Sequence, residues 1–301
     1  MAEIIQKDGT WAFDGDALRL TPGRDKNVSL LRKTLGELVV PLGALAGISI
    51  EQGRKAGRLR LRLRDGADPL LHATGGRLTE PNDPYQLIVE SDRYGVAEYF
   101  VDEVRNALLL DEVPSAPVAE YLLPGPAVPL SVSAGDGTAS FDGEHIRLEW
   151  NWKTEDAKAA AGIRTLALTD LSAVEWHPAV GLDNGHLRFT VKHAPTKAPP
   201  KYDPNSVELW GFKKDPLMAL IAAAVQARLP HPARTATSDV REPHGVRDAR
   251  PEVPSPPVAP AEDDHDALLR RLRELGELRR TGVLTDEEFT LAKQAVLKRM
   301  Q

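Results

Sequence analysis

The stretch Gly9-Thr10-Trp11-Ala12-Phe13-Asp14-Gly15 returns later in the chain as Gly137-Thr138-Ala139-Ser140-Phe141-Asp142-Gly143. An internal match of this kind predicts two copies of one domain. Further parallel segments follow in the same order: 41–48 with 167–174, 57–61 with 185–189, and Asp83-Pro84 with Asp203-Pro204.

The prolines mark the boundaries of the two copies. The 301 residues include 24 prolines, which concentrate between residues 113 and 130 and again beyond residue 230. Such stretches are typical of linkers. We therefore predict a first repeat domain at 1–112, a Pro-rich linker at 113–130, a second repeat domain at 131–229, a disordered Pro-rich linker at 230–264 and a two-helix segment at 265–301.

Composition narrows the class of protein. The chain has no cysteine, which excludes disulfides, thiolate metal sites and a cysteine nucleophile and fits a reducing compartment. Neither a signal peptide nor a membrane span is visible, so we expect a cytoplasmic protein. The net charge of −6 argues against wholesale nucleic-acid binding.

Strict alternation over Gly57–Arg64 predicts a half-buried antiparallel strand, with Leu59, Leu61 and Leu63 on its inner face. Asp65-Gly66 then signals a hairpin turn. Shorter runs favour further strands, at 17–20, 37–40, 48–51, 70–73 and 86–90. Several short strands separated by frequent turns predict a β-rich barrel or sandwich.

Each copy ends with a helical pattern. Val96, Tyr99, Phe100, Val104 and Leu108 recur at spacings of three and four, and the apolar residues of 217–225 do the same in the second copy. The predicted class is thus α+β: two tandem barrel or sandwich domains, each closed by a C-terminal helix. An order in which all strands come first and one helix comes last is typical of a pleckstrin-homology-like domain. The segment 168–175 also resembles a signature of the bacterial pleckstrin-homology-like domains.

Five segments together resemble the bacterial family of unknown function 4429, which typically occurs in tandem. These segments are Gly9–Gly15, Thr34–Leu42, Gly57–Gly66, Gly95–Arg105 and Val207–Pro216. The resemblance covers residues 4–229 and implies no known activity.

The C-terminal segment has its own pattern. A Leu-rich helical face is followed by Thr281-Gly282, and Thr285 with Glu288 then forms a capping box for a second helix. Residues 275–289 resemble the short domain called SHOCT, which implies oligomerisation or attachment. Because about 36 residues rarely sustain a core alone, we expect self-association. The expected contact residues are Leu268, Leu272, Leu275, Leu278, Phe289 and Val296.

The clearest candidate binding surface is a run of basic residues in the first repeat: Arg54, Lys55, Arg58, Arg60, Arg62 and Arg64. It is either a solvated strand face or a patch for lipid headgroups or nucleic-acid phosphates. The second repeat keeps only Arg188 and Lys192 of this run.

Other residue groups favour structure over chemistry. Trp150 and Trp152 should share one face of a strand, for packing or for a ligand groove. His177, His186, His193 and Asp183 match no metal-ligand spacing, so we expect no metal. Asp14-Gly15 and Asp142-Gly143 indicate turns, and recognised catalytic signatures are absent.

We therefore expect a scaffold or adaptor with no enzymatic activity and no cofactor, which associates with itself through the C-terminal helices. The alternative is a peripheral binder of anionic lipid or nucleic acid through the basic run. An enzyme would require a deep polar pocket with convergent carboxylates or histidines.

Overall fold

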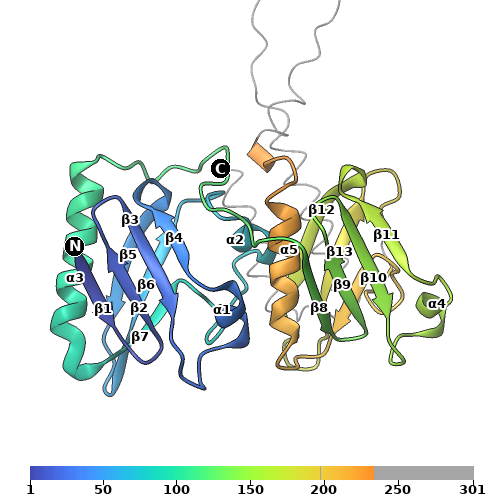
Figure 1. Ribbon diagram of the computed structural model, residues 1–301, viewed down its shortest axis with the longest axis horizontal. Helices are drawn as coiled ribbons and strands as arrows, with labels where there is room; N and C mark the ends of the chain where they lie inside the picture. Colours follow the sequence, from blue (N-terminus) through green and yellow to red (C-terminus); the bar gives the residue numbers. More distant parts are fainter. Residues whose placement is uncertain (197, 234–301) are drawn as a thin grey trace, which may run out of the picture. The chain divides into compact units, whose positions relative to one another are not determined.

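The computed structural model describes residues 1–196 and 198–233. The two-helix segment and nearly all of the second predicted linker therefore lie outside the described residues. Both repeats belong to one compact unit, Met1–Glu242. Within the described residues the protein is α+β, as predicted, with antiparallel sheets and short helices (Figure 1).

The strands of the first repeat are β1 (Ala2–Ile5), β2 (Gly9–Phe13), β3 (Ala17–Pro22), β4 (Leu38–Pro41), β5 (Leu45–Glu51), β6 (Ala56–Leu63) and β7 (Gln86–Glu90). Its helices are α1 (Leu30–Leu35), α2 (Pro69–Thr74) and α3 (Tyr94–Leu110).

The strands of the second repeat are β8 (Leu130–Ala134), β9 (Gly137–Phe141), β10 (His145–Trp150), β11 (Arg164–Ala167), β12 (Leu171–His177), β13 (Gly185–Val191) and β14 (Ser206–Leu209). Its helices are α4 (Asp156–Ala159) and α5 (Met218–Gln226), and a 3₁₀ turn, η4 (Asp215–Leu217), precedes α5.

Each repeat contains a four-stranded sheet followed by a three-stranded sheet. The strand orders are β1-β2-β3-β4 and β5-β6-β7 in the first repeat, and β11-β10-β9-β8 and β12-β13-β14 in the second. Strand pairing does not join the two sheets of either repeat within the described residues. The barrel alternative is therefore not realised, and each repeat consists of two open sheets.

Strand β6 has the predicted alternation. Leu59, Leu61 and Leu63 are buried, and the arginines between them lie on the outer face. The side chains of a strand alternate between its two faces, so the leucines of this run pack into the core and its arginines lie on the opposite face.

Residues 70–73 form part of helix α2, so the strand predicted there is wrong. The Asp68 carboxylate accepts hydrogen bonds from the amides of Leu70 and Leu71, Pro69 occupies the first turn, and Gly75 ends the helix in a left-handed conformation. These are start and stop signals of a helix. Consequently Asp65-Gly66 leads into α2 and does not close a hairpin.

The closing helices lie where they were predicted, but their buried faces differ from the expected ones. In α3 the buried residues are Ala97, Phe100, Val101 and Val104, whereas Val96 and Tyr99 are exposed. Helix α5 is buried along its whole length. Its surroundings explain this, because α5 lies between the sheets of its own repeat and helix α2 of the first repeat (Figure 1).

The two repeats share part of one apolar core. Leu31, Leu70, Ala73 and Leu78 of the first repeat belong to the same buried cluster as the core of the second repeat. The segment between the repeats also packs closely, since a Cβ at Gly125 would lie 2.4 Å from the Cβ of Ala227. The repeats are therefore one packed unit. No described helix is long and apolar enough to cross a membrane.

A half-buried carboxylate joins the two sheets of the first repeat. Asp8, in the turn between β1 and β2, accepts hydrogen bonds from Nη1 of Arg32 at 2.8 and 2.9 Å. Arg32 lies on α1, between β3 and β4, and is nearly fully buried. The same carboxylate accepts from the amide of Ile88 on β7, at 3.3 Å.

The second repeat keeps this arrangement with a different cation. Asp136, in the turn between β8 and β9, pairs with Nζ of Lys158 on α4 at 2.5 Å, and both side chains are buried. The Asp136 carboxylate accepts from the amide of Glu208 on β14 at 2.8 Å, and the Asp136 amide donates to the Glu208 carbonyl. We call this the aspartate clamp: Asp8 with Arg32, and Asp136 with Lys158.

Lys158→Met is expected to lower the free energy of unfolding by about 3–5 kcal/mol, because it leaves the Asp136 charge buried without its partner. Lys153→Met, in the same connection but exposed, is the matched control and should cost less than about 1 kcal/mol. Chemical denaturation followed by circular dichroism measures both. Equal losses in the two variants would show that the clamp does not stabilise the fold.

Candidate functional site

The basic run of the first repeat is divided among several environments. Arg54 and Lys55 lie in the exposed turn between β5 and β6, whereas Arg58, Arg60 and Arg62 lie on the outer face of β6. Arg58 pairs with Glu80 at 2.6 Å, and Arg60 is 4.0 Å from Glu51. The outer face therefore carries charges of both signs.

Arg64, the last member of the run, has the same role as its equivalent in the second repeat, Lys192. Arg64 donates to the Gly43 carbonyl, and Lys192 donates to the Thr169 carbonyl at the equivalent position. Both contacts fix the connection that leads from the four-stranded sheet to the three-stranded sheet. Arg64 also donates to the Ala116 carbonyl, in the segment between the repeats.

Arg188, the equivalent of Arg60, lies 3.3 Å from the buried carboxylate of Asp203. The first repeat places Arg60 near Asp83, in the same Asp-Pro turn, where its charge partly offsets the rise that burial causes in the Asp83 pKa. Arg60 and Arg64 are thus parts of the repeat itself.

The remaining basic residues are Arg54, Lys55, Arg58 and Arg62. Within the described part of the chain, Arg54, Lys55 and Arg62 form no ion pair, although Arg62 donates weakly to the Ala46 carbonyl. A shallow groove of about 500 Å³ borders this face and includes Ser49, Asp83 and Gln86 among its lining residues. Acidic groups in and around it reduce its attraction for an anion.

The tryptophans of the second repeat do not share a strand face, contrary to the prediction. Trp150 is the last residue of β10, and its indole donates to the Gly162 carbonyl at 2.8 Å. Trp152 lies in the following turn with 88% of its surface exposed. The strand ends too early to carry both residues.

Trp152 belongs to a surface group that we call the aromatic cluster: Trp152, Lys153, Trp210 and Phe212. Trp210 is half-buried, and the other three side chains are exposed. The Lys153 ammonium lies 5.2–5.5 Å from the three ring centroids, within the range of cation–π contacts. Trp210 and Phe212 meet edge to face at 6.0 Å. Sequence reasoning missed Lys153 and Phe212, although the pattern Trp210-Gly211-Phe212 directly after a strand was visible.

The loop that carries Trp210 and Phe212 is held in place. The Asp215 carboxylate accepts hydrogen bonds from the amides of Trp210, Gly211 and Phe212, at 2.8–3.0 Å. Gly211 has a positive φ of 83°, which favours glycine at the centre of this turn. A fixed backbone therefore carries the exposed Phe212 ring and the half-buried Trp210 ring.

The structure brings together only two of the four residues His177, His186, His193 and Asp183, whose spacing along the chain matches no metal-ligand pattern. His177 and His186 are directly paired across β12 and β13, and their rings stack at 4.6 Å. Glu175 lies beside them, whereas His193 and Asp183 are exposed and outside the group. The alternation of β12 was the signal for Glu175, because Glu175 and His177 are two residues apart on one strand.

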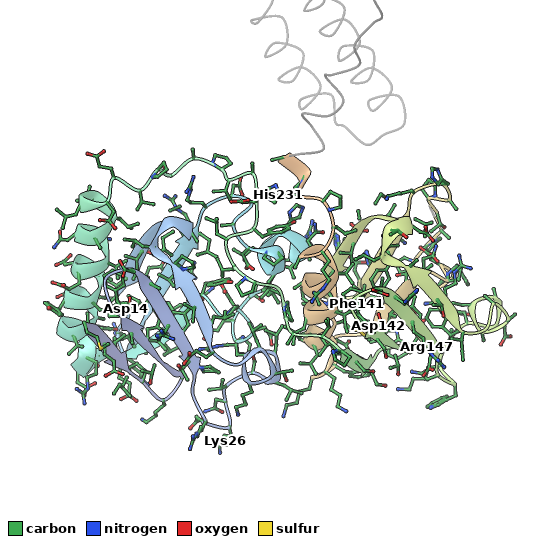
Figure 2. All side chains as sticks on the ribbon, turned by 45° about the horizontal axis from the view of Figure 1, so that its top comes forward. Asp14, Lys26, Phe141, Asp142, Arg147 and His231 are labelled. Carbon is green, nitrogen blue, oxygen red and sulfur yellow. The ribbon has the colours of Figure 1, made fainter. Side chains whose placement is uncertain are left out.

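The turns predicted at Asp14-Gly15 and Asp142-Gly143 are confirmed. Each aspartate accepts hydrogen bonds from the two amides that follow the glycine, and these bonds lower the pKa of both carboxyl groups. Figure 2 labels Asp14 and Asp142, which end equivalent strands of the two repeats.

A pocket of about 610 Å³ lies where the first repeat meets residues 231–233, which follow α5, and sequence reasoning did not find it. His72 and His231 are among its lining residues, and Tyr121 contacts both rings. The Tyr121 hydroxyl lies 3.0 Å from Nδ1 of His72 and accepts from the Gln226 amide. Figure 2 labels His231, close to the last described residue.

A family profile described as a domain of unknown function (DUF4429) matches residues 11–105 and 139–226, which is more than half of the chain. The chain belongs to this family. Each DUF4429 match runs from the second strand of a repeat into its closing helix, so the family unit coincides with one repeat. A comparison with curated proteins finds no match.

The DUF4429 match does not cover the C-terminal segment. The predicted contact residues Leu268, Leu272, Leu275, Leu278, Phe289 and Val296 lie outside the described residues.

Proposed function

We propose that this protein is a cytoplasmic, non-enzymatic adaptor whose two repeats form one binding unit and whose SHOCT-like C-terminal segment gathers several copies. The observation that carries the proposal is the aromatic cluster. Trp152 exposes 88% of its surface in the turn after β10, and Phe212 exposes 58% on the loop that Asp215 holds. Exposed aromatic anchors beside a cation have the composition of binding hot spots.

The shared core of the repeats supports the same proposal. Because Leu70 and Ala73 of α2 pack into the cluster that contains α5, the surfaces of the two repeats have a fixed spacing. A partner that contacts both surfaces loses less conformational freedom on binding than it would with two loosely linked domains.

We also propose that each repeat is a variant of the pleckstrin-homology-like fold. The order of four strands, three strands and a closing helix supports this, as does the packing of α3 against β1, β5 and β7. In this arrangement the helix covers the apolar space between two sheets that strand pairing leaves open.

Trp152→Ala combined with Phe212→Ala is expected to abolish capture of the partner, since it removes the exposed anchors and leaves the Asp215 hydrogen bonds to the backbone in place. The immobilised full chain is incubated with an extract of the source cells, and bound proteins are identified by mass spectrometry. Val96→Ala combined with Tyr99→Ala removes exposed apolar residues from α3 and is the matched control. A partner that the cluster variant retains and the control loses would contradict the proposed surface.

The full chain is expected to form an oligomer that becomes a monomer when the chain ends after Ala233, because the segment then removed carries the predicted self-association helices. Ala233 is chosen as the end because His231 is buried and lies 3.1 Å from the Gly66 carbonyl. Size exclusion with light scattering gives both masses. Two monomers would instead assign the segment to docking on another protein.

A second candidate function is weak binding of an anionic surface, lipid headgroups or nucleic-acid phosphates. Arg54, Lys55 and Arg62 favour it, because within the described residues they form no ion pair and the other repeat has no equivalent cations. At about 1 kcal/mol for each basic residue, the three contribute about 3 kcal/mol. Only an oligomer would bind firmly, through avidity.

Replacing Arg54, Lys55 and Arg62 with Gln should weaken binding to anionic vesicles or to duplex DNA about 100-fold at low salt. The control replaces Arg147, Lys213 and Lys214 with Gln, which changes the net charge equally in the second repeat. Vesicle co-sedimentation and fluorescence anisotropy measure the two ligands. Equal weakening in both variants would mean that total charge, and not this face, is responsible.

A further inference from the structure

Glu175, His177 and His186 form a compact group of donor atoms on the outer face of the sheet β12-β13-β14. Glu175 and His177 project from the same face of β12, and His186 is the direct cross-strand neighbour of His177 on β13. One ligand atom from each residue can be chosen so that all three lie within 4.8 Å of one another.

The distances within the group match those between metal ligands. Nε2 of His177 lies 3.4 Å from one Glu175 oxygen, and Nε2 of His186 lies 3.5 Å from the other. Ligands about 2.1 Å from a tetrahedral Zn²⁺ are about 3.4 Å apart. Each carboxylate–imidazole spacing therefore fits a pair of ligands on one ion if the carboxylate binds through both oxygens. The two rings are stacked with an interplanar angle of 11°, so they must turn for both nitrogens to face that ion.

Nε2 of His186 is buried and has no hydrogen-bond partner in the described structure. Its closest charged neighbour, the Glu175 carboxylate, is at the limit of hydrogen-bond distance. A buried polar atom left without a partner is unfavourable, and a bound cation would satisfy it.

The first repeat shows that the fold does not need these side chains. At the positions equivalent to His177 and His186, the pair across β5 and β6 is Glu51 and Arg58, and Ser49 stands where the second repeat has Glu175. By contrast, the equivalent positions Arg60 and Arg188 carry arginine in both repeats. The imidazole pair is therefore a feature of the second repeat alone.

We infer that Glu175, His177 and His186 bind a divalent transition-metal cation, most suitably Zn²⁺, with a fourth coordination position open to water or to a side chain of a partner. Two imidazoles and one carboxylate are a ligand set that zinc accepts. The exposed fractions of Glu175 and His177, 46% and 32%, leave the group accessible to an ion. The site is independent of the adaptor proposal.

The full chain, stripped with a chelator, is titrated with Zn²⁺ by isothermal calorimetry. We expect one equivalent to bind. His177→Glu combined with His186→Arg introduces the residues of the first repeat and should weaken binding about 100-fold or more, and Glu175→Gln should weaken it about 10-fold. His193→Ala is the control, because this exposed histidine lies just beyond the same strand and should have no effect.

Co²⁺ provides a second readout, because its visible absorption distinguishes tetrahedral coordination by imidazole and carboxylate from loose binding. Circular dichroism confirms that each variant is folded. The inference is overturned if the wild-type chain binds no Zn²⁺, or if the folded double variant binds as tightly as the wild type, since other histidines would then hold the ion. Loss of binding in His193→Ala would overturn it equally.

Discussion

Within the described residues strand pairing does not hold the two sheets of a repeat together, so each repeat depends on the aspartate clamp to link them. In each repeat one carboxylate, Asp8 or Asp136, binds a cation from the connection between the third and fourth strands. The same carboxylate also accepts a hydrogen bond from a backbone amide on the last strand of the other sheet. A buried ion pair stabilises a fold only when further hydrogen bonds complete it, and here the backbone supplies them. The clamp can therefore use arginine in one copy and lysine in the other.

A clamp of this kind allows the surfaces of the two repeats to diverge. The Asp-Gly turns, the Asp-Pro turns and the arginines facing them stay the same, because each satisfies backbone groups or a buried charge. At two positions on the outer face of the three-stranded sheet, the side chains do not have to satisfy a backbone group or a buried charge. There the first repeat has Glu51 and Arg58 and the second has His177 and His186. The helix α2 also differs, since it belongs to the first repeat and covers α5 of the second.

Local patterns predicted much of each repeat. The alternation in β6, the turns after Phe13 and Phe141 and the positions of the closing helices depend on neighbouring residues, so they could be read from the chain. The strand predicted at 70–73 is a helix because a short, mostly apolar run suits either structure. Asp68-Pro69 before the run and Gly75 after it are the signals that favour the helix. The clamp was missed although Asp8 and Asp136 directly precede the two glycines of the repeated motif. Its cations are on other connections, and no short spacing relates Asp136 to Lys158.

The candidate sites depended even more on distant contacts. The aromatic cluster joins the turn after β10 to the loop after β14, and its lysine was not conspicuous in the sequence. The histidines were noticed, but spacing along the chain could not show that the register of β12 with β13 places His177 opposite His186 and excludes His193. The same register aligns this pair with Glu51 and Arg58 of the first repeat. A duplicated domain thus supplies its own comparison. Positions that agree support the fold, and positions that differ on equivalent surfaces are those at which we propose separate binding properties for the two copies.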